Sequence, residues 1–144
     1  MVKILTATNV IQRLHSKGLK VTPQRAAVYA NLLGRTDHPT VEEILSDLNS
    51  DLPVSSKATV YTALTALREV GLVREVLLEE GVTRYDANVD LHHHFRCRAC
   101  GLINDLAWEM FNAPQLQQLN DRFKVESYEV TLRGLCQSCA VQEK

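Results

Sequence analysis

The sequence lacks any long apolar run. None of its 144 residues falls in a stretch approaching the roughly 20 apolar residues that a membrane-spanning helix needs. The first residues also lack the apolar core and the small-residue cleavage site of a secretory signal. Internal repeats and low-complexity segments are missing too, and a hydrophobic content of 45% suits one ordinary domain or two small ones. We therefore expect a cytoplasmic protein with no membrane partner.

The chain has almost no net charge. Its formal charge is -1 at pH 7, which argues against a protein that coats nucleic acid regardless of sequence. A slight excess of Lys and Arg lies in residues 1–75, and residues 76–144 carry a slight acidic excess. This mild division is compatible with a first half that contacts DNA and a second half that is rich in carboxylates.

Cysteine is missing from the first two thirds of the chain and then occurs as two CxxC pairs, Cys97/Cys100 and Cys136/Cys139. In a cytosolic protein, two such pairs predict a closed four-thiolate zinc site with a structural role. The site would tie the beginning of a small domain to its end. The alternatives are four reduced cysteines without metal, a thiol redox switch and a catalytic zinc.

The first half contains helix signals that end in a hairpin. The hairpin combines extended runs at residues 72–78 and 82–86 with a turn at residues 79–81. Short helices followed by such a hairpin predict a winged helix-turn-helix. The expected helices are residues 9–16, Pro23 to about Leu33 after Thr22, Val41 to about Asn49 after the capping box that begins at Thr40, and a fourth from Ser55-Ser56 to Val70.

The second half has a different pattern, beginning after a polar stretch that we interpret as a hinge at residues 87–90. We expect strands at residues 95–97, 102–106 and 125–132 and a helix at residues 114–123, which together make a small α/β domain. The predicted class is therefore α+β. Its domains are a winged-helix domain at residues 1–86 and a dimerisation and metal-sensing domain at residues 91–144.

The fourth helix carries a second polar face. Val60, Leu64 and Leu67 recur at core-facing spacing. The opposite face could reach phosphates, thymine methyls and base edges in a major groove, or it could simply be a solvated face. The residues of that opposite face are Lys57, Tyr61, Thr62, Thr65 and Arg68.

Histidines and carboxylates gather around the first CxxC pair. In an extended segment, His92 and His94 point to one face and His93 to the other. Two imidazoles with nearby carboxylates make a mixed nitrogen and oxygen site that suits iron(II), manganese(II) or zinc. The alternative is a surface stretch with ordinary turn residues. The nearby residues are Asp86, Asp90, Asp105 and His38.

These segments together resemble the ferric uptake regulator (Fur) family over nearly the whole chain. The resemblance rests on order and spacing as much as on any single residue. Its carriers are Gly18-Leu19-Lys20-Val21-Thr22-Pro23-Gln24-Arg25, Ala58-Thr59-Val60-Tyr61, Gly71-Leu72-Val73, Arg84-Tyr85-Asp86, residues 92–101 from His92 to Gly101, and Gly134-Leu135-Cys136-Gln137-Ser138-Cys139.

The resemblance implies a homodimeric repressor that binds AT-rich palindromic operators when it holds a metal co-repressor. It implies that Tyr61 contacts bases and that Lys20 contacts phosphate or the minor groove. It also implies one structural zinc per subunit at the four cysteines and one regulatory iron(II) or manganese(II). The implied regulatory ligands are His38, Asp86, His92, His94 and Asp105.

Some positions favour the peroxide-sensing (PerR) branch of the family. Asp105 stands where iron sensors usually carry Glu, and Thr62 stands where they typically carry Arg. A second metal site of many iron and zinc sensors is interrupted by Leu91, His93 and Tyr128. The branch implies that peroxide, the only small-molecule signal, leads to oxidation of His38 or His92. The alternatives are an iron- or zinc-uptake regulator and, in another class, a small metalloenzyme, although we expect no enzyme.

Overall fold

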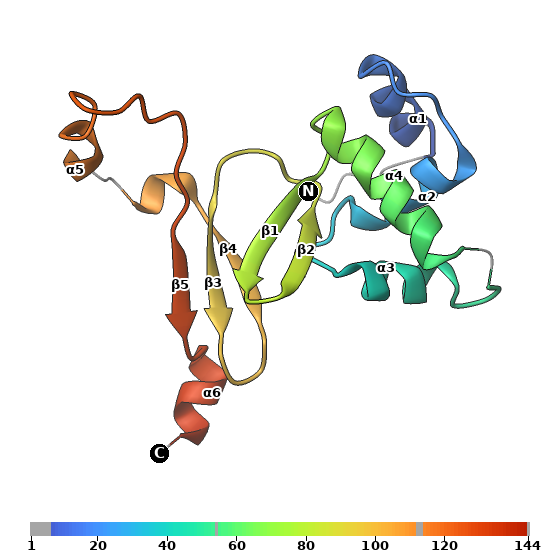
Figure 1. Ribbon diagram of the computed structural model, residues 1–144. Coiled ribbons are helices and arrows are strands. Elements are labelled where there is room, and N and C mark those ends of the chain that lie inside the picture. Colours follow the sequence, from blue (N-terminus) through green and yellow to red (C-terminus); the bar gives the residue numbers. More distant parts are fainter. Residues whose placement is uncertain (1–6, 54, 112–113, 144) are drawn as a thin grey trace. The chain divides into compact units, whose positions relative to one another are not determined.

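The computed structural model describes residues 7–53, 55–111 and 114–143 in two compact units, Met1–Val89 and Asp90–Lys144 (Figure 1). The N-terminal unit is mainly helical and the C-terminal unit holds a small sheet, in agreement with the predicted α+β class. Within the described ranges, no helix has the length and apolar character needed to cross a membrane.

Local capping signals determine where the helices of the N-terminal unit begin. Thr22, Thr40 and Ser56 each accept a hydrogen bond from a backbone N–H of the following helix, and Glu43 completes the capping box of Thr40. These helix starts confirm the predictions from the sequence. Four helices pack around the hydrophobic core of this unit: α1 (Ala7–Ser16), α2 (Pro23–Leu32), α3 (Val41–Leu48) and α4 (Lys57–Glu69).

A hairpin follows α4. Strands β1 (Arg74–Glu79) and β2 (Val82–Asp86) pair antiparallel, with Glu79 opposite Val82. Gly81 adopts a φ of 73°, the left-handed conformation that tight hairpin connections require. The order α3, α4 and hairpin is that of a winged helix-turn-helix, as the sequence predicts.

The C-terminal unit is built on a three-stranded sheet in the order β4-β3-β5. The central strand β3 (His93–Cys97) pairs antiparallel with β4 (Ile103–Leu106) and parallel with β5 (Thr131–Gly134). The remaining elements are a 3-10 turn at Trp108–Met110 and the short helices α5 (Pro114–Gln117) and α6 (Gln137–Gln142).

Two sequence predictions in this unit were wrong in extent. The strand expected from residue 125 begins only at Thr131, because the backbone N–H of Val130 donates to the ring Nδ1 of His93 instead of to a strand. The helix expected over residues 114–123 ends at Gln117, and the chain continues through tighter i to i−3 hydrogen bonds such as Leu119 N–H to the Leu116 carbonyl. Helix α6 was not predicted.

Candidate metal centres and DNA-binding face

The four cysteines form one cluster within the C-terminal unit. Their Sγ atoms all lie within 4.8 Å of one another. Cys97 ends β3 and Cys100 follows in the next turn, whereas Cys136 and Cys139 lie at the start of α6. The two turns are also joined through the backbone, because the N–H of Arg98 donates to the carbonyl of Gly134 at 2.8 Å. The CxxC pairs therefore meet although a whole subdomain separates them in sequence.

The spacing of the sulfurs suits a tetrahedral metal. The Sγ atoms of Cys100 and Cys136 are 3.8 Å apart. Zinc–sulfur bonds of about 2.3 Å in a regular tetrahedron give sulfur–sulfur distances of about 3.8 Å, whereas a disulfide bond is roughly 2 Å long. None of the four cysteines forms a disulfide bond. The donor set and its spacing therefore fit zinc.

Hydrogen bonds within the cluster separate the pKa values of its thiols. Backbone N–H groups of Cys100 and Cys136 lower the pKa of Cys97 to about 6, so this sulfur is a thiolate at neutral pH. Hydrogen bonds with the side chains of Cys136, Cys100 and Cys97 raise the pKa of Cys139 to about 12. The metal-free cluster therefore holds one thiolate, Cys97, while Cys139 keeps its proton. Binding of a metal cation to all four sulfurs would release the remaining protons.

A second group of possible ligands lies in the N-terminal unit. The Nε2 atom of His38 is 3.2 Å from Oδ2 of Asp86, and both side chains are buried. Asp86 ends β2, where it lies opposite Arg74, and His38 lies in the connection between α2 and α3. The pair brings one imidazole nitrogen and one carboxylate oxygen together.

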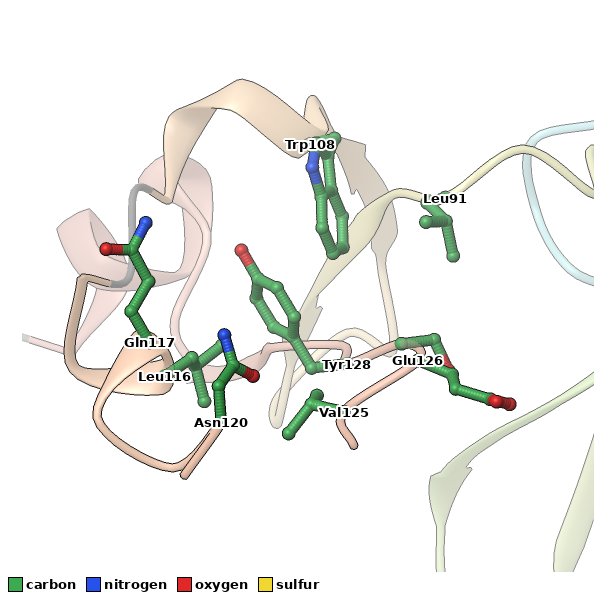
Figure 2. A pocket seen from close by; sticks show the side chains of 9 residues that line it. Leu91, Trp108, Leu116, Gln117, Asn120, Val125, Glu126 and Tyr128 are labelled. Carbon is green, nitrogen blue, oxygen red and sulfur yellow. The ribbon is translucent and has the colours of Figure 1, made fainter. Parts of the chain in front are cut away.

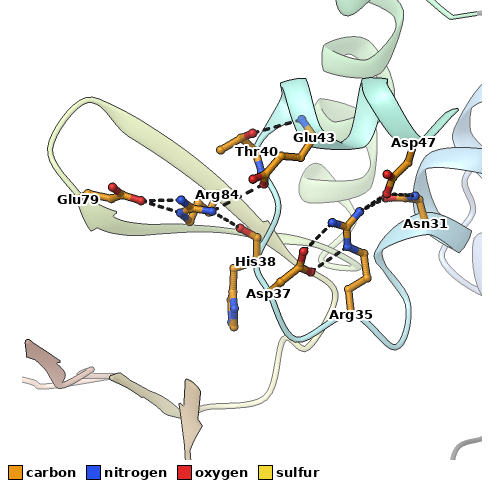
Figure 3. Close-up of polar contacts among 9 residues, drawn as sticks. All are labelled: Asn31, Arg35, Asp37, His38, Thr40, Glu43, Asp47, Glu79 and Arg84. Carbon is orange, nitrogen blue, oxygen red and sulfur yellow. Dashed lines mark hydrogen bonds and ion pairs between the residues drawn. The ribbon is translucent and has the colours of Figure 1, made fainter. Parts of the chain in front are cut away.

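Arg84 fixes the backbone that carries His38 (Figure 3). His38 adopts a φ of 52°, a left-handed conformation that costs a non-glycine residue roughly 1–2 kcal/mol. The Nη1 of Arg84 donates to the His38 carbonyl at 3.1 Å, while its Nε and Nη2 bind Glu79 at 2.8 and 2.7 Å. The N–H of Tyr85 donates to the Pro39 carbonyl at 3.0 Å. Strand β2 therefore holds both members of the His38–Asp86 pair.

A third group lies on β3 and β4 of the C-terminal unit. His94 is directly opposite Asp105 in the antiparallel pair, and His92 directly precedes β3. The Nε2 atoms of His92 and His94 lie 3.5 and 3.6 Å from Oδ1 of Asp105. The Nδ1 of His92 is 2.6 Å from the Asp90 carbonyl, a contact that suits Nδ1–H and leaves the Nε2 lone pair for a metal.

His93 points away from these ligands, as the alternation of a strand predicts. Its ring stacks on Trp108 with a centroid distance of 4.8 Å, and Phe111 and Tyr128 complete an aromatic cluster around it. Its Nδ1 accepts the N–H of Val130 at 2.9 Å, so the proton belongs on Nε2, which lies 3.3 Å from the Trp108 carbonyl. Trp108 and Tyr128 also line a hollow of about 300 Å³ in this unit (Figure 2). His93 is therefore held as a packed, neutral side chain.

The exposed face of α4 carries the residues that the sequence assigned to DNA. Val60, Leu64 and Leu67 are almost fully buried, which confirms the core face of the helix. Lys57 of the polar face pairs with Glu42 of α3, Nζ to Oε1, at 2.6 Å, and its Nζ lies 6.0 Å from the centre of the Tyr61 ring. The exposed candidates are Tyr61, Thr62 and Thr65 on the same helix and Lys20 in the connection between α1 and α2.

Sequence reasoning assigned no role to Arg84 or Glu129. Arg84 reaches the His38 carbonyl across 46 positions of the chain, and only the strand pairing reveals that contact. Oε1 of Glu129 lies 4.0 Å from Nδ1 of His94, because the segment before β5 lies beside β3. No periodicity or spacing links either residue to its histidine.

Comparison with known proteins decides the family. The model of the ferric uptake regulator family matches residues 16–133. The chain belongs to this family. The peroxide-responsive repressor PerR of Staphylococcus aureus strain Mu50 is 33% identical over 130 residues, which cover 90% of this chain and 88% of that protein. Family membership places the chain among regulators rather than enzymes.

Solved structures agree with the fold. The ferric uptake regulator Fur of Helicobacter pylori, described as having three functional metal binding sites, superposes with a TM-score of 0.76 at 24% identity over 97% of each chain. PerR from Streptococcus pyogenes, described in terms of peroxide sensing and gene regulation, gives a TM-score of 0.51 at 28% identity over 92% of each chain.

Proposed function

We propose that this Fur-family protein is a homodimeric, metal-dependent transcription repressor that acts in the cytoplasm on palindromic, AT-rich operator DNA. The main support is the exposed face of α4, where an aromatic ring and two hydroxyls project from a winged-helix core. Tyr61, Thr62 and Thr65 would meet base edges, and Lys57 and Lys20 would meet phosphates or the minor groove.

The four-cysteine cluster holds one structural zinc ion per subunit in this proposal. Its support is the 3.8 Å distance between the sulfurs of Cys100 and Cys136, together with the low pKa of Cys97. Four thiolates leave no open coordination position, so this zinc would fasten β3 to α6 rather than take part in sensing.

The regulatory metal, iron(II) or manganese(II), is proposed to bind between nitrogen and oxygen donors from both units. In each unit the imidazole nitrogens already lie within 3.6 Å of a carboxylate oxygen, a donor set that suits either cation. A ligand shared by both units favours the conformer in which it can bind all donors, and that conformer is the one that fits two operator half-sites. The proposed ligands are His38, Asp86, His92, His94 and Asp105.

Peroxide sensing is the finer part of the proposal. Bound iron(II) would activate peroxide; overall, one peroxide oxygen would be added to the imidazole ring of His38 or His92, the ring would lose two electrons, and the other oxygen would leave as water. An oxidised imidazole binds the metal less well, so the conformer that fits the operator loses its stabilisation. Support comes from Asp105 and from the relative named a peroxide-responsive repressor. The rival function within the family is an iron- or zinc-uptake regulator without peroxide sensing.

The test is mass spectrometry of iron-loaded protein after a brief peroxide pulse, with manganese-loaded protein as the control. We expect one added oxygen at His38 or His92 with iron alone, accompanied by loss of DNA binding. His93, the packed neighbour of His92, serves as an internal control and should stay unmodified. Metal-dependent DNA binding without added oxygen would favour the uptake regulator. DNA binding that is equally tight with and without metal would refute the proposal of a metal-dependent repressor. Turnover of a simple substrate by metal-loaded protein would support the alternative of a small metalloenzyme.

A further inference from the structure

The cations on the polar face of α4 are already paired with carboxylates. Lys57 contacts Glu42 at 2.6 Å, and Arg68 near the end of the helix pairs with Glu75 of β1. A paired cation offers less attraction to a phosphate, because its partner carboxylate repels the same phosphate. A cation near this face that forms no ion pair with a carboxylate should therefore attract the DNA backbone more strongly than Lys57 or Arg68.

Arg25 in the first turn of α2 forms no ion pair within the described ranges. Its Nη1 donates to the Lys20 carbonyl at 2.8 Å. A neutral carbonyl orients the guanidinium without cancelling its charge, so the other N–H groups of the fork stay available. The backbone N–H of Arg25 is capped by Thr22, which places the residue at the positive end of the α2 dipole.

Arg25 also lines two neighbouring pockets, which we call hollows, beside α4, the proposed DNA-binding helix. One hollow, of about 320 Å³, is lined by Arg25 together with Thr22, Thr59 and Thr62 among others. The second, of about 370 Å³, is lined by Arg25 together with Tyr61, Thr62 and Thr65, and Glu69 lies at the same hollow without forming an ion pair with Arg25. A guanidinium between two hydroxyl-rich hollows can bind a phosphate that lies against α4.

We propose that Arg25 is the main phosphate-binding residue of the N-terminal unit and positions Tyr61 and Thr62 over the base edges. This inference rests on the proposed DNA-binding function and names a contact that the sequence did not assign. Arg25 reads no bases itself. Its removal should therefore weaken binding to all duplexes to a similar extent and leave the preference among them intact.

The experiment measures the affinity of manganese-loaded protein for a fluorescent duplex over a series of salt concentrations. The duplex is selected from a random library by the wild-type protein, and a shuffled duplex is measured beside it. Each phosphate contact contributes about 0.9 to the slope of log affinity against log salt, so R25Q should lower the slope by about 2 in a dimer. R25K keeps the charge and should keep the slope.

R13Q is the matched control. Arg13 also donates to a neutral oxygen, the Tyr29 hydroxyl at 3.3 Å, and lines neither hollow. An unchanged slope in R25Q, or an equal decrease in R13Q, would overturn the inference while leaving the proposed function intact. Failure of the wild-type protein to select any duplex would refute the proposed function and this inference with it. Unfolding curves and zinc content establish that each variant is folded.

Discussion

Replacing Arg84 by Lys tests whether β2 holds the His38 ligand in place. Lys keeps the positive charge but cannot bind Glu79 through two nitrogens and the His38 carbonyl through a third, as Arg84 does (Figure 3). Hydrogen bonds to charged groups contribute about 1.5–3 kcal/mol, so R84K should lower the free energy of unfolding by about 2 kcal/mol. The left-handed backbone of His38 then loses the contact that offsets its strain.

The same change should weaken metal binding. If the whole loss of about 2 kcal/mol comes from disorder of the α2–α3 connection that carries His38, manganese affinity decreases by up to about 30-fold, since about 1.4 kcal/mol corresponds to a factor of ten. Calorimetric titration with manganese measures this, and urea unfolding of metal-free protein measures stability. R68K is the control, because its exposed pair with Glu75 should be worth less than about 1 kcal/mol. Unchanged manganese affinity in a folded, destabilised R84K protein would show that the reasoning is wrong.

Three further outcomes are expected. C136S should lose zinc and melt at a lower temperature than the wild type, as zinc analysis and calorimetry would show; retained zinc would contradict the four-thiolate site. In metal-free protein, thiolate absorbance should titrate near pH 6 and lose that step in C97S. Because this folded pKa lies below that of an unfolded thiol, the thiolate stabilises the protein at higher pH, and the contribution disappears as pH falls through about 6. E42Q should free Lys57 and raise affinity for any duplex in a binding titration, whereas unchanged affinity would show that the pair does not restrain Lys57.

The sequence by itself determined the features that depend on neighbouring residues. The capping residues Thr22, Thr40 and Ser56 predicted where their helices begin, since an N-terminal cap acts over three positions of the chain. Alternation along an extended segment separated His93 from the histidines on either side. The two CxxC pairs predicted a joint cluster, because each spacing places two sulfurs on one turn.

Tertiary structure alone decided what depends on partners far along the chain. Val130 gives its N–H to the ring of His93, so β5 starts later than its apolar pattern predicts. Arg84 meets the carbonyl of His38 only after β2 has paired and lies beside the α2–α3 connection. Lys57 stands in the sequence as a free cation, but packing of α3 against α4 places Glu42 beside it. Charge and hydrogen bonding act through space, so their outcome is unknown until distant segments are brought together.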